Sequence, residues 1–195
     1  MGKLIDVQSA KDFVSITSTS QDSLIDFILE KLSSAIARYL ALKGFDYENV
    51  TDIYFPTYGE YKRLLVLSKY PVDLSQPFNI VIVDYQENET SISSDKYFVN
   101  SEKGYVYFQE PLYTNNMIKV TYTAGYQIDV NGVYQNVDDG LRFACLLWFA
   151  TIWNTRELRG IDRIDMTTRQ MIEISTQSIP DDVKQILHQY QRAYL

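Results

Sequence analysis

The longest apolar stretch of the chain runs from Phe143 to Ala150 and continues, across one threonine, to Trp153. This stretch is far shorter than the roughly 20 residues that a membrane span needs, so it predicts a helix inside a protein core. Apolar residues would lie on nearly every side of a helix running from Leu141 to about Leu158. Such a helix must be packed on several sides by other elements. The rest of the chain therefore has to supply its partners.

Helical patterns that could pack against this segment lie at both ends of the chain. Residues Asp6–Val14 predict a short helix, and a longer one follows it. Thr19 and Asp22 have the spacing of a capping box at the start of the longer helix, and Gly44 is expected just past its end. Pro180, followed by two aspartates, predicts the start of a last helix. The apolar stripes of the longer and the last helix are Leu24, Ile25, Ile28, Leu32, Ala35, Ile36, Tyr39 and Leu40, and Val183, Ile186, Leu187, Tyr190 and Tyr194.

Between these helical parts the pattern changes to short runs typical of strands, separated by proline and glycine. The clearest run is Lys119–Tyr126, in which apolar residues and threonines alternate and Gly125 marks a turn. Residues 86–90 are polar and predict an exposed loop. The expected strands are Asp52–Phe55, Arg63–Leu67, Phe78–Asp84, Lys96–Val99, Tyr105–Phe108 and Met117–Thr123.

These patterns together predict an α+β fold. The N- and C-terminal helices are expected to form a bundle, because each has an apolar stripe that needs a partner. We expect the N-terminal helices of the bundle over residues 1–45, a β-rich insertion over 46–126, and the C-terminal helices over 127–195. An extended arm over 160–177 would precede the last helix.

Composition restricts the functional classes. A net charge of −7 argues against a protein that grips nucleic acid through its phosphates. The single cysteine, Cys145, cannot form an internal disulfide and favours a reducing compartment. The first residues have no apolar segment of a signal peptide, and we expect no membrane association. The 16 tyrosines suit protein interfaces, although half-buried strand positions would explain them equally well.

No group of residues has the spacing of a catalytic or ligand-binding site. His188 is the only histidine and is expected on the surface. The pairs Asp138/Asp139 and Asp181/Asp182 each stand at an expected helix start, where capping explains them. No glycine-rich phosphate-binding motif is present. We therefore expect neither catalysis nor a cofactor or metal.

Several segments are informative through their order along the chain: residues 10–17 (AKDFVSIT), 19–23 (TSQDS), 36–39 (IARY), 63–72 (RLLVLSKYPV), 120–126 (VTYTAGY), 179–183 (IPDDV) and 190–192 (YQR). Together they span most of the chain, from residue 10 to residue 192. The ordered set resembles the head–tail connector family of tailed bacteriophages, also called adaptor or head-completion proteins.

The resemblance implies a structural virion protein without catalysis. About twelve copies would form a ring beneath the portal protein at the vertex of the filled capsid. The ring would extend the channel through which double-stranded DNA passes without sequence-specific binding. It would also provide a docking surface for the next neck or tail-completion protein. The protein would be made in the bacterial host cytoplasm and would reside in the neck of the virion.

We expect the C-terminal arm and last helix to contact the portal or a neighbouring copy. Two alternatives remain: a tail-side neck or tail-completion protein, and a binding module of the phage tail that acts through the β-rich insertion alone. The candidate interface residues are Arg159, Arg163, Met166, Arg169, Met171, Tyr190 and Tyr194.

Overall fold

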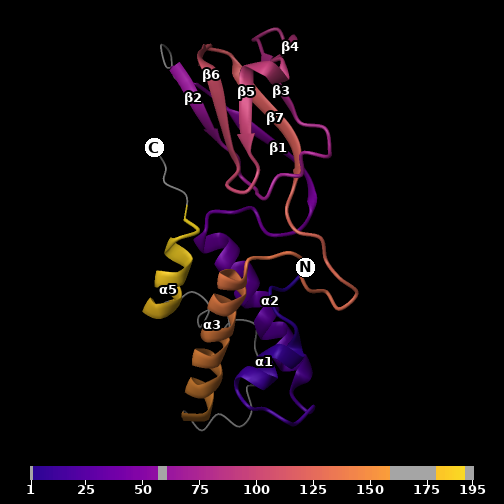
Figure 1. The fold of residues 1–195 in the computed structure, drawn as a ribbon, viewed down its shortest axis with the longest axis vertical. Coiled ribbons are helices and arrows are strands. Elements are labelled where there is room, and N and C mark those ends of the chain that lie inside the picture. The colour runs from indigo at the N-terminus through magenta and orange to yellow at the C-terminus, as the bar shows by residue number, and fades with distance from the viewer. Residues whose placement is uncertain (1, 57–60, 159–178, 192–195) are drawn as a thin grey trace. The chain divides into compact units, whose positions relative to one another are not determined.

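The structure is a computed structural model that describes residues 2–56, 61–158 and 179–191. The chain divides into two compact units (Figure 1). The helical unit comprises the described residues of Met1–Ala41 and Gln127–Ala193, and the β unit comprises those of Leu42–Tyr126. Helices and antiparallel sheets are both present, which confirms the predicted α+β class. The arm expected over 160–177 lies outside the described residues.

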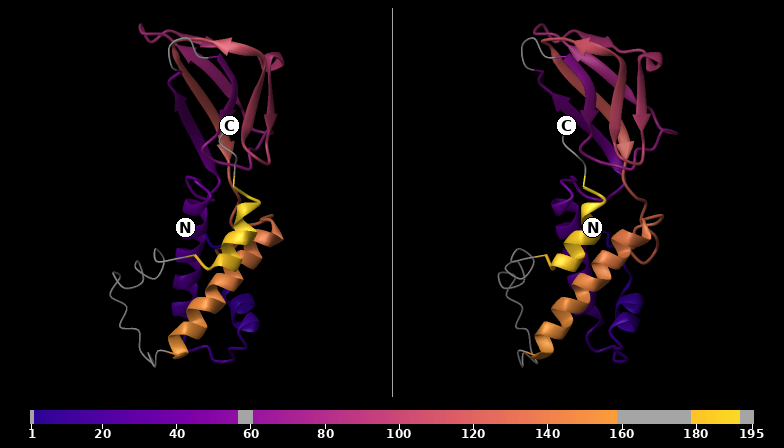
Figure 2. Two further views of the ribbon diagram at one scale, coloured as in Figure 1. Left: turned by 90° about the vertical axis from the view of Figure 1, so that its left-hand side faces the viewer. Right: turned by 60° about the vertical axis from the view of Figure 1, so that its left-hand side comes forward.

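Helix α3 (Asp139–Leu158) is the central element of the helical unit. It packs against α1 (Val7–Phe13), α2 (Asp22–Tyr39) and α5 (Asp181–His188), as the views of Figure 2 show. Contact on several sides explains why α3 is apolar nearly all round, so the prediction of a buried central helix is confirmed. The side chains that α3 buries are Leu141, Ala144, Cys145, Trp148, Phe149 and Trp153.

The start of α2 differs from the prediction. Thr19 and Asp22 do not form a capping box, because the N-cap residue is Gln21 and its side chain makes no capping hydrogen bond. The Asp22 carboxylate instead accepts a hydrogen bond of 2.8 Å from the ammonium of Lys11, whose side chain is buried. A buried ammonium is costly without a partner, which gives Asp22 a different role from the one predicted.

The end of α2 also differs. The residue with left-handed backbone just past the helix is Ala41, with φ of 55°, and not the expected Gly44. The Ala41 N–H donates to the carbonyl of Arg38 at 3.0 Å and so closes the last turn. Gly44 lies three residues further on, in the connection to the β unit.

The β unit is a sandwich of two antiparallel sheets (Figure 2). One sheet has four strands in the order β1-β7-β3-β4 and the other has three in the order β2-β6-β5. Side chains from both sheets form one core. The strands are β1 (Glu48–Tyr54), β2 (Tyr61–Val66), β3 (Asn79–Val83), β4 (Glu89–Ser91), β5 (Tyr97–Asn100), β6 (Tyr105–Tyr113) and β7 (Met117–Ala124), with a short 3₁₀ helix η1 (Ser94–Lys96) before β5.

Strands β1, β4 and β6 depart from the sequence prediction, and β1 does so by beginning at Glu48 rather than at Asp52. Strand β4 lies partly within the segment 86–90 that was expected to be a loop, and all its residues are exposed, so it has no apolar pattern to detect. Strand β6 continues through Pro111, because the pairing with β2 is irregular between Lys62 and Leu64. A bulge accommodates proline, since residues in a bulge leave the ladder of hydrogen bonds.

Gly125 stands where the last strand leaves the β unit, as the sequence predicted for a turn. Its φ is 108°, and its N–H donates to the carbonyl of Pro71 at 2.9 Å. The next residue, Tyr126, donates its N–H to the carbonyl of Phe45 at 2.7 Å. The segment that enters the β unit at Phe45 and the segment that leaves it at Tyr126 therefore lie side by side. Gly125, in the segment that leaves, also contacts Pro71.

Two hairpin turns are built in the same way, one beginning at Asp84 and the other at Asp129. Each aspartate accepts, through one carboxylate oxygen, the backbone N–H groups two and four positions ahead, at 2.8–2.9 Å. The residue three positions ahead has left-handed backbone: φ is 64° at Glu87 and 75° at Gly132. Glycine is favoured at this position, and only the second turn has it.

This comparison predicts that Glu87→Gly stabilises the protein. The free energy of unfolding should rise by about 0.5–1 kcal/mol, because the strain of a left-handed Cβ is removed and is only partly offset by the greater freedom of glycine in the unfolded chain. The matched change Gly132→Ala should lower it by a similar amount, since a Cβ there would meet only Lys3, at an ordinary 3.7 Å. Urea denaturation measures both; a Glu87→Gly protein less stable than its parent would contradict the prediction.

Candidate interaction surfaces

The structure describes one of the seven residues that the sequence suggested for the portal or ring interface. Arg159, Arg163, Met166, Arg169, Met171 and Tyr194 lie outside the described residues. The described one, Tyr190, lies just past the end of α5 and is half-buried. The interface role of the seven residues remains a prediction.

Tyr190 connects the end of α5 to the start of α3. Its hydroxyl donates to the carboxylate of Asp138, which also accepts the N–H of Gly140 at 2.8 Å. A Cβ on Gly140 would stand 2.2 Å from the Tyr190 hydroxyl oxygen, so the glycine leaves the space that the tyrosine fills. This hydroxyl is engaged within its own chain, and Asp138 caps α3 as predicted.

The structure describes Cys145, His188 and the aspartates at the start of α5. His188 is exposed at the end of α5, as expected from the sequence. Cys145 is fully buried, and burial raises the pKa of its thiol to about 12, so it stays protonated at neutral pH. The N-cap residue of α5 is Pro180, and its side chain makes no capping hydrogen bond. Asp181 and Asp182 therefore lie in the first turn of α5 and do not cap the helix, contrary to the prediction. Asp181 pairs with Lys184 at 2.9 Å, and Asp182 accepts the N–H of Val183 at 2.9 Å.

Within residues 2–56, 61–158 and 179–191, no group of three or more Cys, His, Asp or Glu side chains is placed to hold a metal ion. In the same part of the chain, no helix combines the length and the apolar character needed to cross a membrane.

A buried polar cluster around Asp52 ties the β unit together. The Asp52 carboxylate accepts hydrogen bonds from the Ser68 N–H at 2.6 Å, the Ser68 hydroxyl at 2.5 Å, the Tyr122 hydroxyl at 2.7 Å and the Lys43 ammonium at 3.0 Å. Burial alone would raise the pKa of Asp52, but these hydrogen bonds outweigh it and hold the pKa below its ordinary value. Burial, with the nearby Asp52 carboxylate, raises the pKa of Tyr122. The cluster joins β1, β7 and the segment after β2, and it serves folding.

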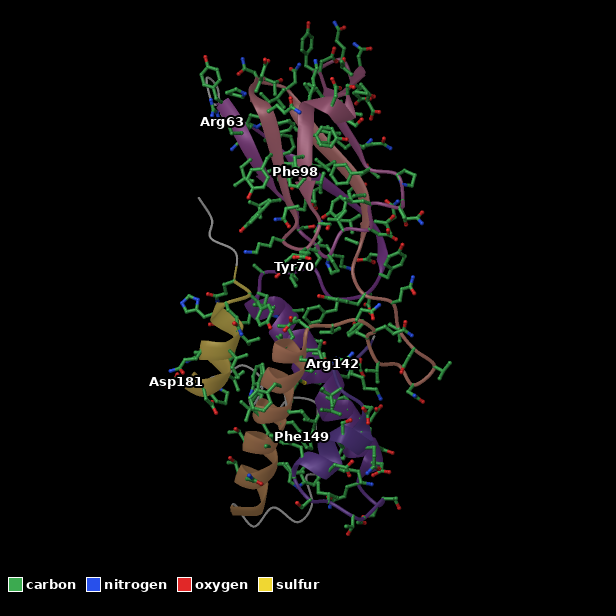
Figure 3. All side chains as sticks on the ribbon, viewed as in Figure 1. Arg63, Tyr70, Phe98, Arg142, Phe149 and Asp181 are labelled. Atoms are coloured by element: carbon green, nitrogen blue, oxygen red, sulfur yellow. The ribbon has the colours of Figure 1, made fainter. Side chains whose placement is uncertain are left out.

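One edge of the sandwich exposes apolar side chains beside basic ones. Strands β1 and β2 are each at the edge of their sheet, and the Tyr54 hydroxyl of β1 donates to the Val66 carbonyl of β2 at 2.8 Å. Phe55, directly after β1, is 78% exposed. Arg63 on β2 is also exposed (Figure 3). We call this the β1/β2 edge; its exposed or half-buried side chains are Ile53, Phe55, Tyr61, Lys62 and Arg63.

The opposite edge of the sandwich exposes aromatic side chains beside acidic ones. Strands β4 and β5 are the other edge strands, and η1 connects them directly. Tyr85, in the turn before β4, is 89% exposed, and Phe98 on β5 is 64% exposed (Figure 3). We call this the β4/β5 edge; its exposed side chains are Tyr85, Glu87, Glu89, Asp95, Lys96 and Phe98.

Sequence reasoning missed both edges. It identified the tyrosine-rich strands as suitable for protein contacts but named no residue there. The alternation of a strand shows which face is buried, but not which strand ends up without a neighbour. A weak signal was available in Phe55 and Tyr85, each a large aromatic residue next to turn residues.

Solved structures that share the fold of this chain include three from one kind of particle. Chains of the neck of an empty gene transfer agent (GTA) particle, computed with C6 symmetry, and of the virion of the native particle have TM-scores of 0.57 and 0.54 at 14% and 12% identity; each alignment covers 98% of this chain and 91% of the other. A chain of the native GTA neck computed with C12 symmetry has a TM-score of 0.50 at 13% identity, over 100% of this chain and 97% of the other.

No curated protein matches the sequence. The family model of head completion proteins matches residues 3–193. Because this match spans nearly the whole chain, both units are included in it. The chain belongs to the head completion protein family.

Proposed function

We propose that this chain is a structural component of the head–tail neck of a tailed phage or phage-like particle, where it forms a ring beneath the portal. The match to the head completion family over residues 3–193 carries this proposal. The fold supports it, since chains of GTA necks superpose along almost their whole length. The ring would extend the DNA channel and provide a docking surface for the next neck or tail component.

Cyclic symmetry supports the ring. The similar chains occur in reconstructions of necks computed with C6 and C12 symmetry. In a closed ring every copy meets two neighbours through two different surfaces, which is a heterologous contact. Because one of these necks was computed with C12 symmetry, we propose about twelve copies of this chain in a head-to-tail ring.

The charge of the chain suits a channel for DNA in transit. At −7 per copy, a ring has a strongly negative overall field, which opposes adhesion of the phosphate backbone. Double-stranded DNA would therefore pass through the ring without sequence-specific binding.

A non-enzymatic role is part of the proposal. The buried Cys145 has a raised thiol pKa, and Asp138 is used to cap α3 and bind Tyr190. His188 stands alone on the surface of α5. A nucleophile and an oriented base are therefore not brought together in the described residues.

Co-purification with the portal protein of the same particle tests the proposal. We expect a stable complex whose mass corresponds to several copies of this chain for each portal ring. A variant with Arg163→Ala, Met166→Ala, Arg169→Ala and Met171→Ala should lose the complex, because the arm is the proposed portal contact. The matched control Lys103→Ala, in the turn between β5 and β6 of the β unit, should keep portal binding.

Failure to bind the portal at any salt concentration would contradict this position in the neck. Binding to a tail-tube or tail-completion protein instead would identify a tail-side neck protein. Binding to a tail partner through the β unit alone would identify a binding module of the phage tail. The arm variant would then bind that partner as well as the parent protein does.

A further inference from the structure

We infer that the β units of neighbouring copies in the ring meet edge to edge, with the β1/β2 edge of one copy against the β4/β5 edge of the next. This inference rests on the proposed ring and specifies one of its contacts. The occupant of each edge is a second copy of this chain.

Both edges have the features of contact surfaces. Among the described residues, each of the four strands pairs with a single neighbour in its sheet. Edge strands of this kind are usually protected or paired. Here they instead stand beside highly exposed aromatic side chains, Phe55 on one edge and Tyr85 and Phe98 on the other. Exposed aromatic groups together with open edges indicate a surface that is covered on assembly.

The charges of the two edges are complementary. Both charged residues of β2, Lys62 and Arg63, are basic. On β1, the exposed Glu48 pairs with the buried Lys69 at 2.5 Å, and Asp52 is buried. The β4/β5 edge has the acidic Glu87, Glu89 and Asp95 against one lysine, Lys96. Glu89 also pairs with Lys119 of β7 at 2.8 Å, so Glu87 and Asp95 provide most of the excess negative charge. Contact of opposite charges favours one edge against the other and disfavours either edge against itself.

The positions of Phe55 and Tyr85 along the strand direction also match. Strands β1 and β3 both pair antiparallel with β7, so they run in the same direction. Tyr54 of β1 and Ile82 of β3 both lie opposite Ile118. Phe55 and Tyr85 therefore lie toward the same end of the sandwich, on opposite edges. Side-by-side copies related by the ring axis would bring them together without a large shift.

Cysteine cross-linking on the portal-bound ring tests this contact. The native Cys145 is fully buried, so background reaction should be low. Cysteines are introduced at exposed positions by Phe55→Cys, Tyr85→Cys or both, and a short bis-maleimide is added. The double variant should give a ladder of covalent multimers. Each single variant should remain monomeric, because a head-to-tail ring does not place equivalent residues side by side.

A second measurement does not depend on cross-linking. Arg63→Glu should lower the fraction of chain found in rings at low salt by at least about tenfold, since it places like charges in contact. The matched control Lys103→Glu, in the turn between β5 and β6, should assemble like the parent. Circular dichroism of both proteins checks that they are folded.

The outcomes separate this contact from the proposed function. A ring that forms on the portal but gives no ladder, with Arg63→Glu assembling normally, overturns the edge contact and leaves the ring. Dimers from Phe55→Cys alone indicate a two-fold contact and also overturn it. Absence of any ring overturns the proposed function and this contact with it.

Discussion

Gly125→Val should unfold the β unit. The Cβ of any other residue at this position would lie 2.2 Å from the carbonyl oxygen of Asp46 and 2.8 Å from that of Phe45. These are backbone atoms, held in place by the hydrogen bond from the Tyr126 N–H to the Phe45 carbonyl. The φ of 108° adds backbone strain. We expect a loss of more than about 4 kcal/mol in the free energy of unfolding, since neither the strain nor the overlap can be relieved by a side-chain rotation.

Gly44→Val is the matched control. Gly44 also has left-handed backbone, with φ of 129°, but nothing lies within 4 Å of the Cβ position. The free energy of unfolding of this variant should fall only by the cost of backbone strain, about 1–2 kcal/mol. Urea denaturation followed by tyrosine fluorescence measures both proteins. Equal losses in the two variants would show that backbone conformation alone explains the need for glycine at position 125.

Asp52→Ala should lower the free energy of unfolding by about 3 kcal/mol, the second-largest effect we expect. The change leaves the buried hydroxyl of Tyr122 and the N–H of Ser68 without their acceptor. Lys43 is largely exposed and can return to water, so it adds little. Thr51→Ala is the control, because Thr51 is exposed on the same strand and makes only a 3.4 Å contact with Thr121. If Asp52→Ala lowers the free energy of unfolding no more than Thr51→Ala does, the buried polar cluster around Asp52 does not stabilise the β unit as proposed.

The effect of Asp52→Ala should also depend on pH. The pKa of Asp52 is lower in the folded protein than the ordinary value of about 3.9 expected in the unfolded chain. Its stabilising contribution is therefore complete above about pH 4 and is lost as pH falls through the folded pKa. Other aspartates with lowered pKa, such as Asp6 and Asp84, make both proteins sensitive to acid. The difference in stability between parent and variant isolates Asp52, and it should shrink below about pH 4.

The helical unit was largely predictable from the sequence because burial leaves a local pattern there. The apolar run around Trp148 gave a central helix, and its observed bounds, Asp139–Leu158, agree with the expectation. The details at the helix ends were less accessible. Asp22 was expected to cap α2, but it binds the buried Lys11, a contact between residues eleven positions apart that spacing rules do not include.

In the β unit, the alternation of buried and exposed residues was predictable, and the pairing of the strands was much less so. Strand β7 buries every second residue, as its sequence pattern indicated. Strand β4 has only exposed residues, and β6 passes through Pro111 by means of a bulge, so neither follows a local rule. The two edges arise from the order of strands in each sheet, which depends on contacts far apart in sequence. Interaction surfaces built from edges are therefore visible only once the strands have been placed.

The proposed ring in the neck between head and tail can be tested by electron microscopy of this chain mixed with its portal protein. We predict a second ring stacked on one face of the portal, coaxial with it and continuous with its channel. Portal particles that remain bare at saturating concentrations of the folded chain, in both low and high salt, would contradict the claim.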